Sequence, residues 1–126
     1  MNNSLAYNTY AQNNIGVESP QKLIEMLYEG ILRFNMQAKR AIASDDIEKR
    51  TYWINRSTAI FSELLNTLSF DDNSDISHYL HGLYSHQLQS LSEANLDNDI
   101  EKINQVNLVV KGLLEAWRES TTVGMD

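Results

Sequence analysis

The sequence contains no cysteine, one proline and five glycines among its 126 residues. The lack of cysteine excludes disulfide bonds, thiolate metal sites and thiol catalysis. So few helix-breaking residues favour long helices. No apolar run approaches the roughly 20 residues of a membrane-spanning helix, so we expect no membrane insertion. The first residues lack the basic and apolar regions of a secretory signal, which favours a cytoplasmic location.

The composition is that of one soluble domain. Hydrophobic residues make up 42% of the chain, which is enough for one core. Seventeen acidic residues outnumber ten Lys and Arg residues, giving a formal charge of −7. An acidic chain without a strongly basic cluster is poorly suited to nucleic acid or to anionic membranes. We therefore expect neither as a partner.

Hydrophobic periodicity predicts a helical domain between two less regular ends. We expect an N-terminal arm over residues 1–18, a bundle over 19–120 and a frayed tail over 121–126. The bundle should contain four helices, at about 20–43, 46–68, 75–94 and 99–119. Ser19 and Pro20 give the first helix a clear start, because serine caps free backbone N–H groups and proline is tolerated at the first helical position.

Four helices of similar length with short connections predict an all-α fold, an antiparallel up-and-down four-helix bundle with an N-terminal arm or short extra helix. Each helix has one apolar stripe for the core. These stripes include Ile24, Leu27, Ile31, Phe34, Ala38, Ala41, Ile47, Ile54, Phe61, Leu65, Leu68, Ile76, Leu80, Leu83, Leu91, Ala94, Ile103, Val106, Val110, Leu113, Leu114 and Trp117.

Several large apolar residues lie off these stripes when residues are placed at about 100° per step. Broad packing inside the bundle explains any one of them equally well. Because they occur on three helices and in the arm, we interpret them together as a partner-binding surface. The predicted partner-binding residues are Leu5, Tyr7, Tyr10, Tyr28, Leu32, Tyr52, Ile60 and Leu108. A vacant surface of this kind also allows a weak homodimer.

Histidines offer the main alternative, a histidine phosphotransfer or metal-binding helical bundle. Asp75, His78 and His81 are spaced to meet on one helix face. However, the chain has no Glu-x-x-His pair, and the helix that carries these histidines has no Lys or Arg to hold a phosphoryl group. Glu25 and Glu29 are one turn apart and could form an acid/base pair, but Arg33 follows Glu29 at the next turn, so a surface ion pair explains Glu29 better. We therefore predict that the protein is not an enzyme and has no catalytic residue, metal or cofactor.

The stretch from Ser19 to Gly30 reads SPQKLIEMLYEG, and it resembles the signature of the FliS family of flagellar secretion chaperones. The arm with Tyr7 and Tyr10, the acidic break at Asp45-Asp46 and the closing sequence LLEAW at 113–117 are also similar to that family. The resemblance extends from about Leu5 to Arg118.

This resemblance implies a function as well as a helical bundle. It implies a cytoplasmic chaperone that binds the C-terminal segment of flagellin, prevents its premature polymerisation and presents it for flagellar type III export. The implied partners are flagellin, the export machinery and other flagellar regulatory proteins. In this family the arm can cover part of the binding surface and move when the client binds, so the resemblance gives that role to Tyr7 and Tyr10.

Overall fold

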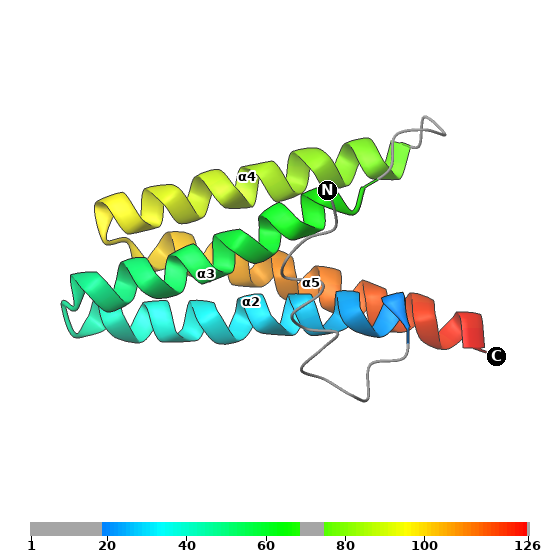
Figure 1. The fold of residues 1–126 in the computed structure, drawn as a ribbon, viewed down its shortest axis with the longest axis horizontal. Helices are drawn as coiled ribbons and strands as arrows, with labels where there is room; N and C mark the ends of the chain where they lie inside the picture. The colour runs from blue at the N-terminus through cyan, green and yellow to red at the C-terminus, as the bar shows by residue number, and fades with distance from the viewer. Residues whose placement is uncertain (1–18, 69–74, 126) are drawn as a thin grey trace.

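The structure, a computed structural model, describes residues 19–68 and 75–125, with side chains as far as residue 121. These residues form the helices α2 (Pro20–Ala43), α3 (Ile47–Asn66), α4 (Asp75–Asp97) and α5 (Ile100–Met125). The described part contains no strand, and each helix packs against two neighbours in the ring α2–α3–α4–α5 (Figure 1). The predicted all-α four-helix bundle is therefore confirmed. The arm, with Leu5, Tyr7 and Tyr10, lies outside the described residues.

The helix starts follow from local capping. The Ser19 hydroxyl accepts a hydrogen bond from the backbone N–H of Lys22 at 3.2 Å, with Pro20 in the first helical turn. The Asp46 carboxylate accepts one from the backbone N–H of Lys49 at 3.1 Å. Both contacts satisfy backbone donors that have no partner within the helix.

Two tight turns close one end of the bundle, which we call the closed end. Asp45, between α2 and α3, has φ 56°, and Asn98, between α4 and α5, has φ 55°. Aspartate and asparagine tolerate this left-handed conformation better than other residues with a side chain. Arg50 ties the two turns together, because it donates to Asn95 Oδ1 at 2.7 Å and to Asn98 Oδ1 at 2.9 Å.

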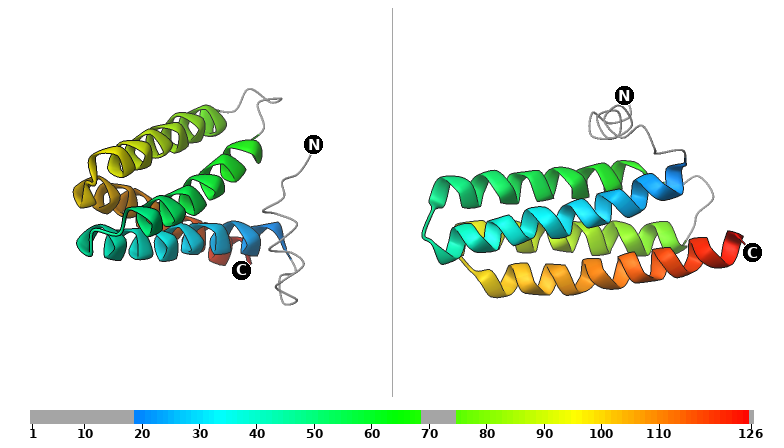
Figure 2. Two further views of the ribbon diagram at one scale, coloured as in Figure 1. Left: turned by 60° about the vertical axis from the view of Figure 1, so that its left-hand side comes forward. Right: turned by 90° about the horizontal axis from the view of Figure 1, so that it is seen from below.

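The opposite end, which we call the open end, holds the start of α2 and the end of α5. There α3 and α4 diverge from α2 and α5 (Figure 2). Between the two ends, the core is filled by side chains that are less than 2% exposed. The largest apolar ones are Phe61, Leu27, Ile31, Ile54, Leu64, Leu91, Ile103, Val106 and Val110.

Two helices are longer than the sequence predicted. We expected α4 to end near residue 94 and α5 near 119, but they continue to Asp97 and Met125. No proline interrupts either stretch. In this part of α5, the Thr121 hydroxyl donates to the carbonyl of Trp117, one turn earlier in the helix, at 3.1 Å.

Two predicted core residues are largely exposed. Ile47 is 64% exposed and Ile76 is 70% exposed. Each lies in the first turn of its helix, where neighbouring helices no longer flank it on both sides. Helical periodicity gives the direction of a side chain but not its position along the bundle, so the expectation that these two residues are buried was wrong.

Two residues expected outside the core are inside it. Tyr28 and Ile60 are each only 3% exposed, so the expectation that they lie outside the core was wrong. The reason is that α2 packs against both α3 and α5, and α3 against both α2 and α4. A helix with two neighbours buries a wider arc than the single narrow stripe that we assigned to it.

A buried polar layer crosses the middle of the bundle. The Ser57 hydroxyl on α3 donates to Asn35 Oδ1 on α2 at 2.5 Å. Asn35 Nδ2 in turn donates to Asn107 Oδ1 on α5 at 2.8 Å. Asn35 and Ser57 are both 0% exposed. Because unpaired polar groups are costly inside a core, this layer favours one axial register among three helices.

A second buried polar contact joins α2 to α4. The hydroxyl oxygens of Tyr28 and Tyr84 lie 2.6 Å apart, and the Tyr84 ring packs against Phe61 at 6.1 Å between ring centroids. Burial raises the pKa of both tyrosines above the usual value of 10.0, although the hydrogen bond between the two hydroxyls partly opposes this for Tyr28. The contact spans the interior between two helices that do not pack directly.

We predict that Asn35→Ala lowers the free energy of unfolding by about 2–4 kcal/mol, because it leaves a cavity and removes the partner of the Ser57 hydroxyl. Urea unfolding followed by circular dichroism measures this loss. Asn55→Ala, at an exposed position of α3, is the matched control and should change stability by less than about 0.5 kcal/mol. Equal losses in the two variants would contradict a stabilising role for the polar layer.

We also predict a loss of stability in alkali. The folded state raises the pKa of both tyrosines above the unfolded value of 10.0, so their contribution is complete below pH 10 and falls as the pH rises above it. For Tyr84, whose pKa burial raises far above 10.0, the loss is about 1.4 kcal/mol at pH 11. In urea unfolding at pH 8 and pH 11, Tyr84→Phe should show a smaller pH-dependent loss than the parent protein. The same loss in both proteins would refute this assignment.

Candidate partner-binding cleft

An apolar cleft of about 560 Å³ opens between the four helices at the open end of the bundle. Its lining combines the start of α2, the residues at the end of α3, the first half of α4 and the end of α5. The lining residues are Pro20, Leu23, Ile24, Leu27, Tyr28, Thr67, Leu68, Ile76, Leu80, Tyr84, Leu113, Ala116, Trp117 and Ser120. None of them carries a charge, so the cleft suits an apolar occupant.

The cleft exists because the helices diverge where the filled core ends. Leu27 and Tyr84 are almost completely buried and belong to both the core and the cleft, whereas Leu80 and Leu113 are half-buried. Ala116 and Ser120 are exposed and present small side chains along α5. The cleft is therefore a continuation of the hydrophobic core to the surface, with room for additional apolar side chains.

The Tyr28–Tyr84 hydroxyl pair is the main polar feature of the cleft lining. Both rings contribute to the lining, while both residues are only 3% exposed. Their hydroxyl groups are hydrogen-bonded to each other, so neither tyrosine leaves an unpaired buried oxygen in the cleft lining. The tyrosines therefore support the cleft wall without making it strongly polar.

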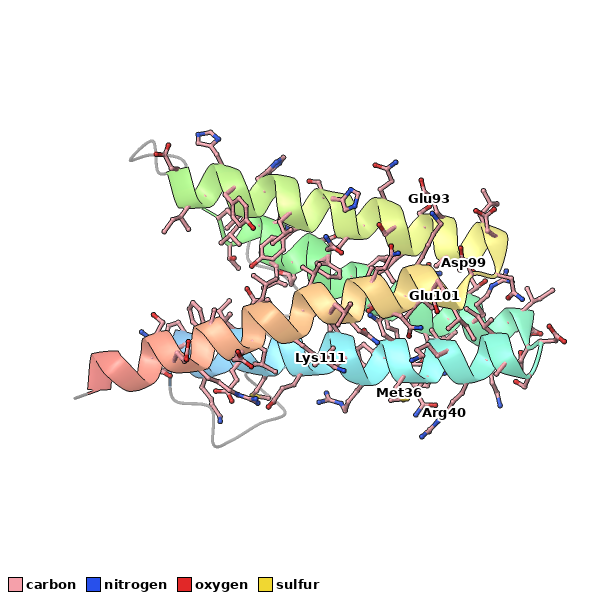
Figure 3. The ribbon with its side chains drawn as sticks, turned by 180° about the vertical axis from the view of Figure 1, so that it is seen from behind. Met36, Arg40, Glu93, Asp99, Glu101 and Lys111 are labelled. Carbon is pink, nitrogen blue, oxygen red and sulfur yellow. The ribbon has the colours of Figure 1, made fainter. Side chains whose placement is uncertain are left out.

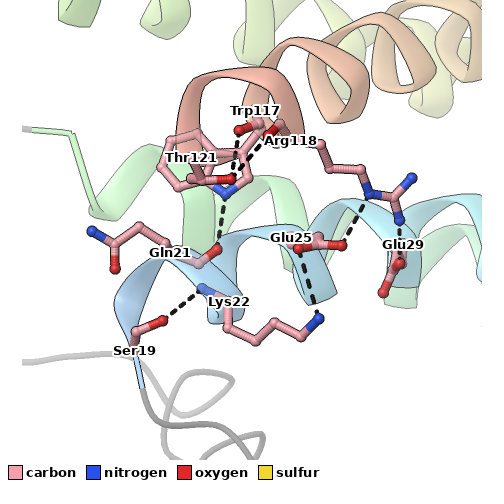
Figure 4. A network of polar contacts seen from close by, with 8 residues as sticks. All are labelled: Ser19, Gln21, Lys22, Glu25, Glu29, Trp117, Arg118 and Thr121. Atoms are coloured by element: carbon pink, nitrogen blue, oxygen red, sulfur yellow. Dashed lines mark hydrogen bonds and ion pairs between the residues drawn. The ribbon is translucent and has the colours of Figure 1, made fainter. Parts of the chain in front are cut away.

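A polar clasp holds the start of α2 to the end of α5 beside the cleft (Figure 4). Trp117 Nε1 donates to the carbonyl of Gln21 at 2.8 Å. Arg118 donates to Glu25 at 2.9 Å and to Glu29 at 2.5 Å. The hydrogen bond to Glu25 is the main reason that the pKa of Arg118 is raised. The clasp fixes the indole ring that forms one wall of the cleft.

The predicted partner-binding residues on the helices do not form one surface. Tyr28 lines the cleft, Ile60 is buried in the core, and Leu32 is half-buried against it. Tyr52 is 52% exposed and Leu108 is 70% exposed, but neither lines the cleft. The structure thus brings only one of these five residues into the cleft.

Sequence analysis missed most of the lining because it assigned these residues to the core. Ile24, Leu80, Leu113 and Trp117 are on the predicted core stripes, yet they also form the cleft. Periodicity cannot separate the two roles, since core and cleft share the same helix faces. One signal was available, because the signature stretch from Ser19 to Gly30 supplies all the α2 residues of the lining.

The histidine alternative gains no support from the geometry. Among the described residues there is no group of three His, Cys, Asp or Glu side chains placed to hold a metal ion. Within residues 19–68 and 75–125, none of the helices combines the length and the apolar character that a membrane span would require.

Comparison with known proteins is consistent with these observations. A sequence profile of the family described as "Flagellar protein FliS" matches residues 1–123. The flagellar secretion chaperone FliS of Campylobacter jejuni is 60% identical over 119 residues, covering 94% of this chain and 93% of that protein. The flagellar secretion chaperone FliS of Bacillus subtilis is 31% identical over 114 residues, covering 90% and 84%. The Escherichia coli protein of the same name is 28% identical over 123 residues, covering 91% and 90%.

The family profile spans almost the entire bundle, including the stretch from Ser19 to Gly30 that supplies the α2 residues of the apolar cleft. This chain therefore belongs to the FliS family of flagellar proteins.

Proposed function

We propose that this chain is a cytoplasmic chaperone that binds the C-terminal segment of flagellin, prevents its premature polymerisation and presents it for flagellar type III export. Membership of the FliS family supports the chaperone role, which is not enzymatic. The observation that carries the proposal is that the stretch resembling the family signature lines an uncharged cleft open to the surface.

The cleft suits a helix or extended segment with an apolar stripe. Such a stripe, when exposed on an isolated flagellin, would be an aggregation hazard. Burying it in the cleft stabilises the complex by about 25 cal/mol per Å² of apolar surface, while the cost of ordering a flexible segment offsets part of this gain. The balance permits tight but reversible binding, so release needs no chemical step by the chaperone.

The arm is proposed to regulate access to the cleft. Ser19 caps α2 and Pro20 lines the cleft, so the arm joins the bundle at the cleft itself. Leu5, Tyr7 and Tyr10 lie within fourteen positions of Ser19, close enough in sequence for the chain to reach the cleft. They could supply apolar groups that the client replaces. Tyr28 remains a proposed client contact, as part of the cleft wall.

We predict that the purified protein binds flagellin but not flagellin lacking its last ~40 residues, a length typical of segments that order on a partner. Isothermal titration calorimetry with both forms measures the difference. Because binding would bury apolar surface, the heat-capacity change with intact flagellin should be negative. Equal affinity for both forms would reject the C-terminal segment as the ligand.

We further predict that Ile76→Gln weakens flagellin binding by about three- to tenfold, because it removes an apolar side chain from the cleft. Ile76 is 70% exposed, so the melting temperature should hardly change. The matched control is Leu96→Gln on the same helix, at the closed end, where the side chain is 84% exposed. If both variants bind like the parent protein, the cleft is not the client site.

A further inference from the structure

The positive charge of this acidic protein is concentrated in one part of the chain. Residues 33–56 hold six of the ten Lys and Arg residues and only three acidic residues, which leaves four basic and fourteen acidic residues elsewhere. In Figure 3, Arg40 projects from α2, whereas Glu93, Asp99 and Glu101 lie near the α4–α5 turn. The charge distribution is therefore strongly asymmetric.

Within this positive region, aromatic rings and arginines form a continuous patch across α2 and α3. The Phe34 and Trp53 ring centroids are 5.6 Å apart, and those of Tyr52 and Trp53 are 4.9 Å apart, edge to face. The Arg56 guanidinium lies 4.8 Å from the Phe34 centroid and 5.6 Å from that of Tyr52. Arg33 lies 6.0 Å from the Phe34 centroid. We call these five residues the aromatic–arginine face.

The arginines of this face differ from those with an evident structural role. Arg118 pairs with two carboxylates, and Arg50 bonds two asparagine side chains across the closed end. In contrast, no carboxylate among the described residues lies within ion-pair distance of Arg33 or Arg56. Both arginines are exposed.

Arg56 is held in position but keeps donors available. One of its nitrogens lies 3.4 Å from the Tyr52 hydroxyl, and contact with two rings restrains the guanidinium. A guanidinium has five N–H donors in a planar fork that matches a carboxylate. Restraint by aromatic rings lowers the entropy cost of forming that pair. Arginine, tyrosine and tryptophan are also the residues that dominate binding energy in protein interfaces.

We propose that the aromatic–arginine face is a second docking surface, which binds an acidic segment of a protein partner. A carboxylate of that segment pairs with Arg56 or Arg33, and a neighbouring apolar side chain packs against Tyr52 and Trp53. Charge complementarity favours an acidic partner, because residues 33–56 carry a net positive charge although the whole chain has a net charge of −7. Nucleic acid is disfavoured because its binding draws most of its affinity from many phosphate contacts, and this face offers only two arginines.

This surface is separate from the apolar cleft. None of its five residues lines the cleft. On α3, Trp53 lies thirteen positions before the end of the helix at Asn66, whereas on α2 Arg33 follows the cleft residue Tyr28 by only five positions, about 8 Å. The proposal therefore rests on residues other than those of the cleft and does not depend on flagellin binding.

The two tryptophans allow the two surfaces to be observed separately, because Trp53 belongs to the aromatic–arginine face and Trp117 to the cleft. In a ¹H–¹⁵N NMR spectrum of the full chain, each indole N–H gives its own signal. We expect a synthetic helical peptide carrying glutamates and one phenylalanine to shift the Trp53 signal but not that of Trp117. The same peptide with lysine in place of glutamate should shift neither.

Arg56→Gln should weaken binding of the glutamate peptide roughly tenfold, which is typical for loss of a charge-assisted hydrogen bond. Lys111→Gln removes one positive charge from an exposed site on α5 and is the matched control, with unchanged affinity expected. Arg33→Gln provides a second variant should Arg56→Gln fold poorly, as judged by its melting temperature.

Four outcomes would overturn the proposal. They are equal binding of the glutamate and lysine peptides, a shift of Trp117 alone, unchanged affinity in both arginine variants, and tighter binding of an oligouridylate than of the glutamate peptide. A salt-sensitive dimer of the free protein, seen by sedimentation and abolished by Arg56→Gln, would instead assign the face to contacts between copies of this chain.

Discussion

The hydrogen bond between the hydroxyl groups of Tyr28 and Tyr84 connects α2 to α4 at the point where the filled core gives way to the apolar cleft. These helices are opposite each other in the ring, so only long side chains can bridge them. Toward the closed end, the space between the helices is filled by apolar side chains and by the polar layer of Asn35, Ser57 and Asn107. Toward the open end, the helices diverge and the same apolar faces are left available to another chain.

The two ends of the bundle are stabilised by different interactions, and this difference has a functional consequence. At the closed end, left-handed turn residues and the contacts of Arg50 hold the helices together with directional hydrogen bonds. At the open end, the clasp of Trp117 and Arg118 joins α2 to α5 only. An apolar cleft beside one such clasp can admit a segment without disturbing the packed middle of the bundle.

The two candidate surfaces differ in chemistry as well as in position. The cleft is uncharged and extends the core, so it distinguishes binding partners by their apolar area and shape. The aromatic–arginine face combines cations with rings, so it discriminates by the charge of the partner. A chaperone with both could hold its client at one surface while another protein contacts the other.

Much of this fold follows from the sequence alone. The scarcity of proline and glycine, the caps at Ser19 and Asp46 and the apolar periodicity determine four helices, because each of these signals acts within one or two helical turns. Residues such as Leu27 and Phe61 were correctly placed in the core for the same reason. The signature from Ser19 to Gly30 also pointed to the family, and it supplies part of the cleft.

Only the tertiary structure decided which apolar residues are buried, which line the cleft and which are exposed. Tyr28 and Ile60 are buried because their helices each have two neighbours, whereas Ile76 is exposed because it lies at the end of the bundle. Asn35 has a polar side chain that is buried only because Ser57 and Asn107 meet it from other helices. Burial depends on the relative positions of helices far apart in the sequence, and periodicity within one helix carries no information about those positions.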